Sequence, residues 1–236
     1  MKIVTVADLH YNEEARPRAE ALAHAACASE ADVLVLAGDC AADGPEFIPD
    51  VLSLFADFDG PRLMVPGNHD LWQHEGPFET ARLLEETLPE IAAAHGFHCL
   101  DRAPFVVGDT AFVGSMGWYD FSFRQTEPPL AGLTVTPIAV SPGHDGQMAF
   151  EAVPGSREMR WEELGPDDYV PGGLIWQTEG PPHVTVWMDA VRLDWGRGAP
   201  EVTAKLAARL HQQVVSVASQ ARRVVEIGRA SCRERV

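Results

Sequence analysis

Three short polar motifs follow directly on three apolar segments in the first third of the chain. The motifs are Asp-Leu-His at 8–10, Gly-Asp at 38–39 and Gly-Asn-His-Asp at 67–70. Each apolar segment is short and rich in Val, Leu or Ile, which is typical of a buried strand. Open α/β sheets bind their ligands at the carboxyl ends of their strands, so these motifs are expected to meet at one edge of a sheet.

Helical patterns separate the predicted strands. Residues 16–30, 45–58 and 78–94 carry apolar side chains at intervals of three and four, and Pro45 suits a first helical turn. Alternation of strand and helix is typical of βαβ units. The sequence therefore predicts an α/β fold with a largely parallel central sheet.

The second half of the chain has a different composition. Apolar runs on either side of the Gly-Asp pair at 108–109 predict a hairpin. Residues from about 125 to 198 are rich in Pro, Gly and Trp, and we expect a long insertion that lies over the sheet edge as a lid or a substrate-selecting flap. A helix is expected over 201–222, and a strand is expected to begin at Arg223.

The last residues, 226–236, read EIGRASCRERV, and their Arg-rich composition departs from the acidic body of the chain. This string is similar to a translation of sequencing-adapter DNA joined to a gene fragment. An ordinary basic tail is the alternative, and it would also be unstructured. We therefore expect 226–236 to be a non-native tail, and residues 1–225 to form a single domain whose C-terminal part is missing.

Charge and composition restrict the classes of partner that the chain can bind. The formal net charge of −17 disfavours electrostatic binding of nucleic acid. A small phosphorylated substrate remains compatible with this negative net charge, because metal ions can invert the local electrostatic field at a site. No apolar run approaches the ~20 residues that span a bilayer. The four cysteines form no CxxC pair, which is typical of reduced thiols in a cytoplasmic protein. The sequence indicates no oligomeric state.

The residue types in the motifs suit metal ions. Asp8 and His10 are two residues apart at a predicted strand end, so their side chains are expected to point to the same side and hold one cation. Asp39 offers two oxygens and could bridge to a second cation, while Asn68 offers a carbonyl oxygen and His69 a nitrogen or a proton. Such mixed ligands suit Mn, Fe, Zn or Ni rather than calcium. Two cations of this kind would form a clamp for in-line displacement at phosphorus.

The motifs and their order resemble those of the calcineurin-like metallophosphoesterase family. The resemblance covers residues 1–119, and more loosely 186–225. It implies a four-layer α-β-β-α sandwich with two sheets face to face and helices outside. It also implies metal-dependent hydrolysis of phosphate mono- or diesters at a centre of two divalent metal ions.

The resemblance also implies roles for individual residues. Asp8 and His10 would bind the first metal, and Asp39 would bridge both metals. Asn68 would bind the second metal and contact the phosphate. His69 would protonate the departing oxygen as a general acid, or would stabilise the phosphate in the transition state. Histidine suits this role because its usual pKa lies close to neutral pH.

The sequence departs from the family pattern in several places. The later histidine at a strand end and the Gly-His-x-His motif are both missing, so we expect this chain to bind metal weakly and to be catalytically impaired. Asp43 is one position later than the second Asp of the protein phosphatase branch, and Asp70 stands where that branch has Glu. These differences favour a small-molecule or nucleotide phosphoesterase. Asp70 itself is expected to orient its neighbours.

Two less specific interpretations stay open. An isolated Asp or Asn after a strand is commonly a helix cap or a turn former. The chain could also be a non-catalytic metal- or ligand-binding protein on the same fold, in which the insertion has taken over the function.

Overall fold

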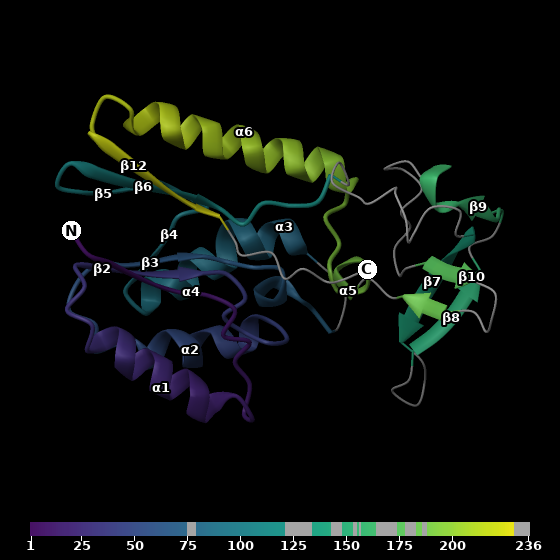
Figure 1. The fold of residues 1–236 in the computed structure, drawn as a ribbon, viewed down its shortest axis with the longest axis horizontal. Coiled ribbons are helices and arrows are strands. Elements are labelled where there is room, and N and C mark those ends of the chain that lie inside the picture. Colours follow the sequence, from purple (N-terminus) through teal and green to yellow (C-terminus); the bar gives the residue numbers. More distant parts are fainter. Residues whose placement is uncertain are drawn as a thin grey trace.

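The first four strands form a parallel sheet in the order in which they occur along the chain (Figure 1). They are β1 (Ile3–Val6), β2 (Val33–Ala37), β3 (Arg62–Val65) and β4 (Phe97–Cys99). Every residue of β2 is buried, which explains its unbroken apolar sequence. The computed structural model describes residues 1–74, 79–120, 134–142, 148–152, 155, 157–163, 174–177, 183–185 and 188–228. The predicted α/β fold is confirmed.

Helical segments connect these strands. They are α1 (Arg16–Cys27), η1 (Pro45–Phe47), α2 (Ile48–Leu54), η2 (His69–Leu71), α3 (Thr80–Arg82), η3 (Leu83–Thr87) and α4 (Leu88–Ala94). The helices predicted over 45–58 and 78–94 are each divided into shorter pieces. Pro49 and Pro89 stand in the first turns of α2 and α4, and proline cannot donate the backbone hydrogen bond that continues a preceding turn.

A second sheet lies between the first sheet and the long helix α6 (Ala199–Val217) (Figure 1). Its strands are β5 (Phe105–Val107), β6 (Thr110–Ser115) and β12 (Arg223–Gly228), in the order β12-β6-β5. The antiparallel pair of β5 and β6 confirms the predicted hairpin. With α1 and α2 on the far side of the first sheet, the layers run helix, sheet, sheet, helix, as the sandwich fold requires.

The strand β12 begins at the predicted residue, Arg223, and is parallel to β6. It continues through 226–228, so it extends three residues past the boundary that the sequence placed at 225. Residues 229–236 lie outside the described residues. The helix α6 starts two residues earlier than predicted and ends at Val217 rather than at 222.

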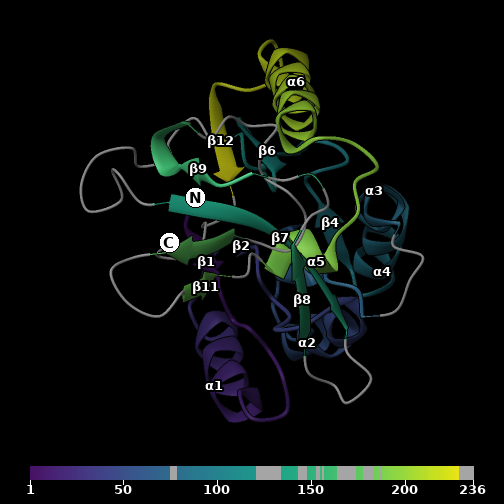
Figure 2. The ribbon, with the colours of Figure 1, turned by 90° about the vertical axis from the view of Figure 1, so that its right-hand side faces the viewer.

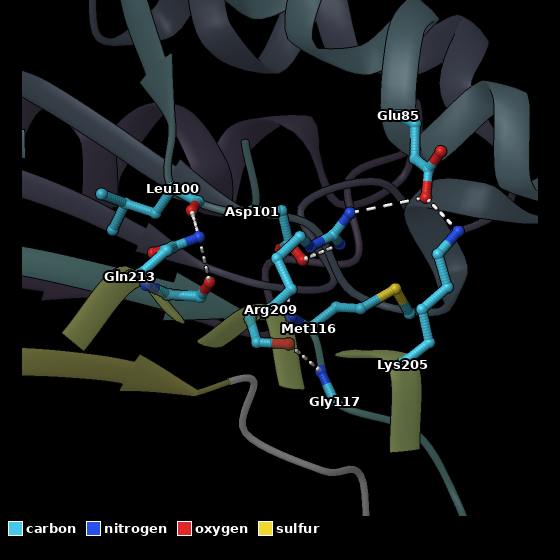
Figure 3. Close-up of polar contacts among 10 residues, drawn as sticks. Glu85, Leu100, Asp101, Met116, Gly117, Lys205, Arg209 and Gln213 are labelled. Carbon is cyan, nitrogen blue, oxygen red and sulfur yellow. Dashed lines mark hydrogen bonds and ion pairs between the residues drawn. The ribbon is translucent and has the colours of Figure 1, made fainter. Parts of the chain in front are cut away.

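Polar side chains fasten α6 to both sheets (Figure 3). Gln213 is buried; its Nε2 atom donates to the Leu100 carbonyl oxygen at 2.8 Å, and its Oε1 atom accepts from the Gly114 backbone nitrogen at 3.2 Å. Leu100 follows β4 and Gly114 lies in β6, so one glutamine connects the two sheets.

One helical turn earlier, Arg209 contacts two carboxylates (Figure 3). Its Nη2 atom lies 3.0 Å from Oδ1 of Asp101, and its Nη1 atom lies 3.5 Å from Oε1 of Glu85. Asp101 is fully buried and also accepts a hydrogen bond from the backbone nitrogen of Met116 at 3.0 Å. Burial raises the pKa of Asp101 to about 7, although Arg209 acts in the opposite direction.

The stretch expected to be a long insertion contains a third sheet, whose strands the sequence did not predict. Its elements are β7 (Thr134–Pro142), β8 (Met148–Ala152), β9 (Met159–Arg160), η4 (Trp161–Glu163), β10 (Leu174–Gln177), β11 (His183–Thr185) and α5 (Met188–Arg192). The strand order is β11-β10-β7-β8, and β9 pairs with β7. Figure 2 views the molecule from the side on which this sheet lies. Figure 1 places this sheet beyond α5, at the end of the molecule away from the N-terminus. Every helix among the described residues is too short or too polar to span a bilayer.

Candidate metal centre

The first two motifs are held together by backbone hydrogen bonds. The Asp8 nitrogen donates to the Gly38 carbonyl oxygen at 3.1 Å, and the His10 nitrogen donates to the Asp39 carbonyl oxygen at 3.0 Å. These bonds continue the parallel pairing of β1 with β2 beyond the ends of both strands. The first motif therefore runs alongside the second.

The backbone at these positions is not a strand. β1 ends at Val6, and φ is 52° at Asp8, 44° at His10 and 50° at Asp39. Positive φ is uncommon outside glycine, although Asp and His are among the residues that tolerate it best. Strand alternation therefore does not orient Asp8 and His10, because β1 ends before either residue.

The third motif approaches the second at its glycine. The backbone nitrogen of His69 donates to Oδ1 of Asp39 at 3.2 Å. A Cβ atom at Gly67 would overlap both this oxygen and the Asp39 backbone nitrogen. Only glycine lets the loop after β3 come this close to the loop after β2.

Asp70 fastens the same two loops from the other side. Its Oδ1 atom accepts from the Ala41 nitrogen and its Oδ2 atom accepts from the Gly67 nitrogen, both at 2.7 Å. Burial raises the pKa of Asp70 to about 7. Both carboxylate oxygens are engaged with backbone, so Asp70 orients its neighbours, as the sequence predicted.

Three of the candidate residues come together. Ligand atoms of His10, Asp39 and His69 lie within 4.8 Å of one another, with Asp39 fully buried and both histidines partly buried. Burial lowers the pKa of His10, and the neighbouring His69 lowers it further. A lowered pKa keeps the imidazole neutral, which is the form that binds a metal ion. Asp8 is exposed and lies outside this group of three.

The ring of His69 is fixed on two sides. Its Nδ1 atom donates to the Ala42 carbonyl oxygen at 2.7 Å, because a carbonyl can only accept. The ring packs against Trp72 with centroids 3.7 Å apart. With a proton on Nδ1, neutral His69 has a lone pair on Nε2 for a cation. The imidazolium form has a proton there to donate.

Asn68 has the surroundings of a metal ligand. It is 2% exposed, and its Nδ2 atom donates to Oδ1 of Asp189 at 2.5 Å. Its Oδ1 atom is buried with no hydrogen-bond partner. Burying a carbonyl oxygen without a partner is unfavourable, and a cation would supply the missing interaction. The residues present therefore fit a divalent metal ion.

Sequence reasoning missed two residues of this site, Asp189 and Trp72. Asp189 lies in α5, 121 residues from Asn68, and Trp72 Nε1 donates to the same carboxylate oxygen at 2.7 Å. No motif or periodicity marks Asp189 in a stretch dominated by Pro and Gly. Trp72 lies two residues past the third motif, and only this closeness in sequence indicates that it belongs to the site.

The residues of this site lie in a part of the chain that matches a known protein family. The family model described as calcineurin-like phosphoesterase matches residues 1–207, which include the three motifs and α5. No curated protein matches the chain.

Proposed function

The chain belongs to the calcineurin-like phosphoesterase family, and from this premise we propose that it hydrolyses phosphate mono- or diesters with two divalent metal ions at the ends of β1, β2 and β3. The convergence of His10, Asp39 and His69 within 4.8 Å is the observation that carries this proposal. The substrate is a small phosphorylated molecule, because the net charge of −17 repels a nucleic acid backbone.

Each polar residue of the motifs has a role in this proposal. Asp8 and His10 hold the first metal, Asp39 offers its carboxylate to both metals, and Asn68 presents its carbonyl oxygen to the second. Bound divalent ions would supply Lewis-acid charge beside the phosphoryl group. Nitrogen and oxygen ligands in this mixture suit Mn, Fe, Zn or Ni.

His69 is the general acid of the proposed reaction. Its Nδ1 atom is anchored on Ala42 and its ring rests on Trp72, so the direction of Nε2 is set before a substrate arrives. As an imidazolium, the ring can donate the Nε2 proton to the departing oxygen and keep the Nδ1 hydrogen bond throughout.

The number of ligands limits the expected activity. The later histidine and the Gly-His-x-His motif that the family pattern includes do not occur in the sequence. We propose that the second metal consequently binds weakly to this chain and that hydrolysis is slow.

Metal binding and hydrolysis of two generic esters test the proposal. Mn²⁺ binding is measured by calorimetry, and hydrolysis with p-nitrophenyl phosphate and bis-p-nitrophenyl phosphate. Asp39→Ala should abolish Mn²⁺ binding and any Mn²⁺-dependent hydrolysis, whereas Asp59→Ala, which removes an exposed carboxylate, should change neither. A chain that binds Mn²⁺ and hydrolyses neither ester would favour the non-catalytic binding protein. A chain that binds no Mn²⁺ would contradict the proposal.

A further inference from the structure

A carboxylate from a distant part of the chain contacts the proposed ligand Asn68. Asp189 in α5 is 3% exposed, and its Oδ1 atom accepts hydrogen bonds from Nδ2 of Asn68 and from Nε1 of Trp72. The distances are 2.5 Å and 2.7 Å. Two donors that follow β3 therefore converge on one oxygen of α5.

Asp189 determines which end of the Asn68 amide faces the rest of the site. An ionised carboxylate can only accept hydrogen bonds, so the NH₂ group of Asn68 must be the end that faces it. The Oδ1 atom then points away from Asp189, and this atom is buried without a hydrogen-bond partner. Turning the amide over would place its oxygen against the carboxylate, with two acceptors in contact.

Other contacts hold α5 against the same loop. The Gln73 backbone nitrogen donates to the Arg192 carbonyl oxygen at 3.2 Å, and Nη1 of Arg192 donates to Nδ1 of His74 at 2.8 Å. Both contacts involve Arg192, three residues after Asp189 in the same helix. A helix anchored in this way can fix a side chain more closely than a free loop can.

We propose that Asp189 is a positioning residue, whose carboxylate holds Asn68 so that its Oδ1 atom faces the second divalent cation. This inference rests on the proposed function, in which Asn68 is a metal ligand. Metal ligands are commonly oriented by outer hydrogen-bond partners of this kind. The stretch 125–198 therefore contributes to the metal site itself, beyond any covering role.

A different role for the same contact is that of a substrate mimic. The family resemblance implies that Asn68 contacts the phosphate, and the Asp189 carboxylate could stand in its place until substrate arrives. Burial and the second donor favour the positioning role. If substrate displaced the Asp189 carboxylate, Trp72 Nε1 would also lose its hydrogen-bond partner, and a buried N–H without a partner is unfavourable.

Calorimetric titration of the full chain with Mn²⁺ alone tests the inference. The step that disappears in Asn68→Ala identifies the binding event to follow. Asp189→Ala should weaken that step by about 10–100-fold and leave the other step within about twofold. Asp189→Asn should have a smaller effect, because its amide oxygen can still accept. Asp194→Asn, which removes an exposed carboxylate from the same segment, should match the wild type.

Each outcome decides between the roles. Wild-type affinity in Asp189→Ala overturns the positioning role and leaves the proposed function standing, whereas a wild type that binds no Mn²⁺ overturns both. Tighter binding of inorganic phosphate by Asp189→Ala, at unchanged Mn²⁺ affinity, identifies a substrate mimic instead. Should Asp189→Ala fail to fold, Trp72→Phe decides: it removes one donor and should weaken the same step, and an unchanged step overturns the inference.

Discussion

Oδ1 of Asp39 accepts a hydrogen bond from the backbone nitrogen of His69 at 3.2 Å, which ties the loop after β2 to the loop after β3. The carboxylate that the family resemblance makes a bridging ligand is therefore oriented by the residue proposed as the general acid. Gly67 makes the approach of the two loops sterically allowed.

Substitution of Gly67 should disrupt the site. A Cβ atom at this position would overlap Asp39, so Gly67→Ala must displace one of the two loops. We expect Mn²⁺ affinity to fall at least about tenfold and the free energy of unfolding to fall by about 1–3 kcal/mol. Calorimetry and urea unfolding measure the two effects. Gly198→Ala is the control. A Cβ atom at Gly198 would lie 3.9 Å from its nearest neighbour, Cδ of Pro200, so this variant should leave both quantities near wild type. Equal behaviour of the two variants would contradict the steric argument.

His69→Asn should separate the acid role from a ligand role. A general acid matters most when the leaving group is a poor one, so the rate should fall by about 10²–10⁴-fold with phenyl phosphate and by less with p-nitrophenyl phosphate. Mn²⁺ affinity should stay near wild type. Equal losses with both esters, together with loss of Mn²⁺ binding, would instead identify His69 as a metal ligand.

Gln213 should contribute strongly to stability, because it joins the two sheets through Leu100 and Gly114. Gln213→Ala leaves buried backbone groups without these partners, and we expect a loss of about 1–3 kcal/mol in the free energy of unfolding. Gln212→Ala changes the exposed neighbour on the same helix and should cost less than about 0.5 kcal/mol. Urea unfolding of both variants checks the difference, and a Gln213→Ala variant as stable as Gln212→Ala would refute it.

Stability should depend on pH through Asp101. Its pKa is raised from 3.8 to about 7 in the folded chain. Between these values the folded state keeps a proton that the unfolded state releases, so the free energy of unfolding falls as pH rises. The stability that the Asp101 proton contributes is fully present below about pH 4 and is lost as pH rises through about 7. The total loss in the free energy of unfolding is up to about 4 kcal/mol.

The measurement compares Asp101→Asn with the wild type in urea unfolding at pH 4.5 and pH 8. The stability of the wild type relative to the variant should decrease between the two pH values, because the variant has no proton to release at this position. Asp59→Asn, at an exposed carboxylate, should show no such change. A relative stability that increases with pH would mean that the Arg209 ion pair outweighs burial.

Much of the fold was predictable because its signals are local. The apolar runs before the three motifs, the helical spacing between them and the Gly-Asp turn at 108–109 each specify structure within a few residues of sequence. Strand ends in a parallel sheet share one edge, so the meeting of His10, Asp39 and His69 followed from the order of the motifs. The third sheet was missed because its Pro and Gly doublets hid the strand pattern.

The sequence by itself therefore determined the α/β class, the alternation of strands and helices in the first hundred residues and the residue types at the site. Only the tertiary structure decided that positive φ angles at Asp8 and His10 replace strand alternation, and that Asp189 holds Asn68. The physical reason is distance along the chain. Periodicity reports which face of one element is buried, whereas a hydrogen bond between residues 121 positions apart depends on how separate elements pack.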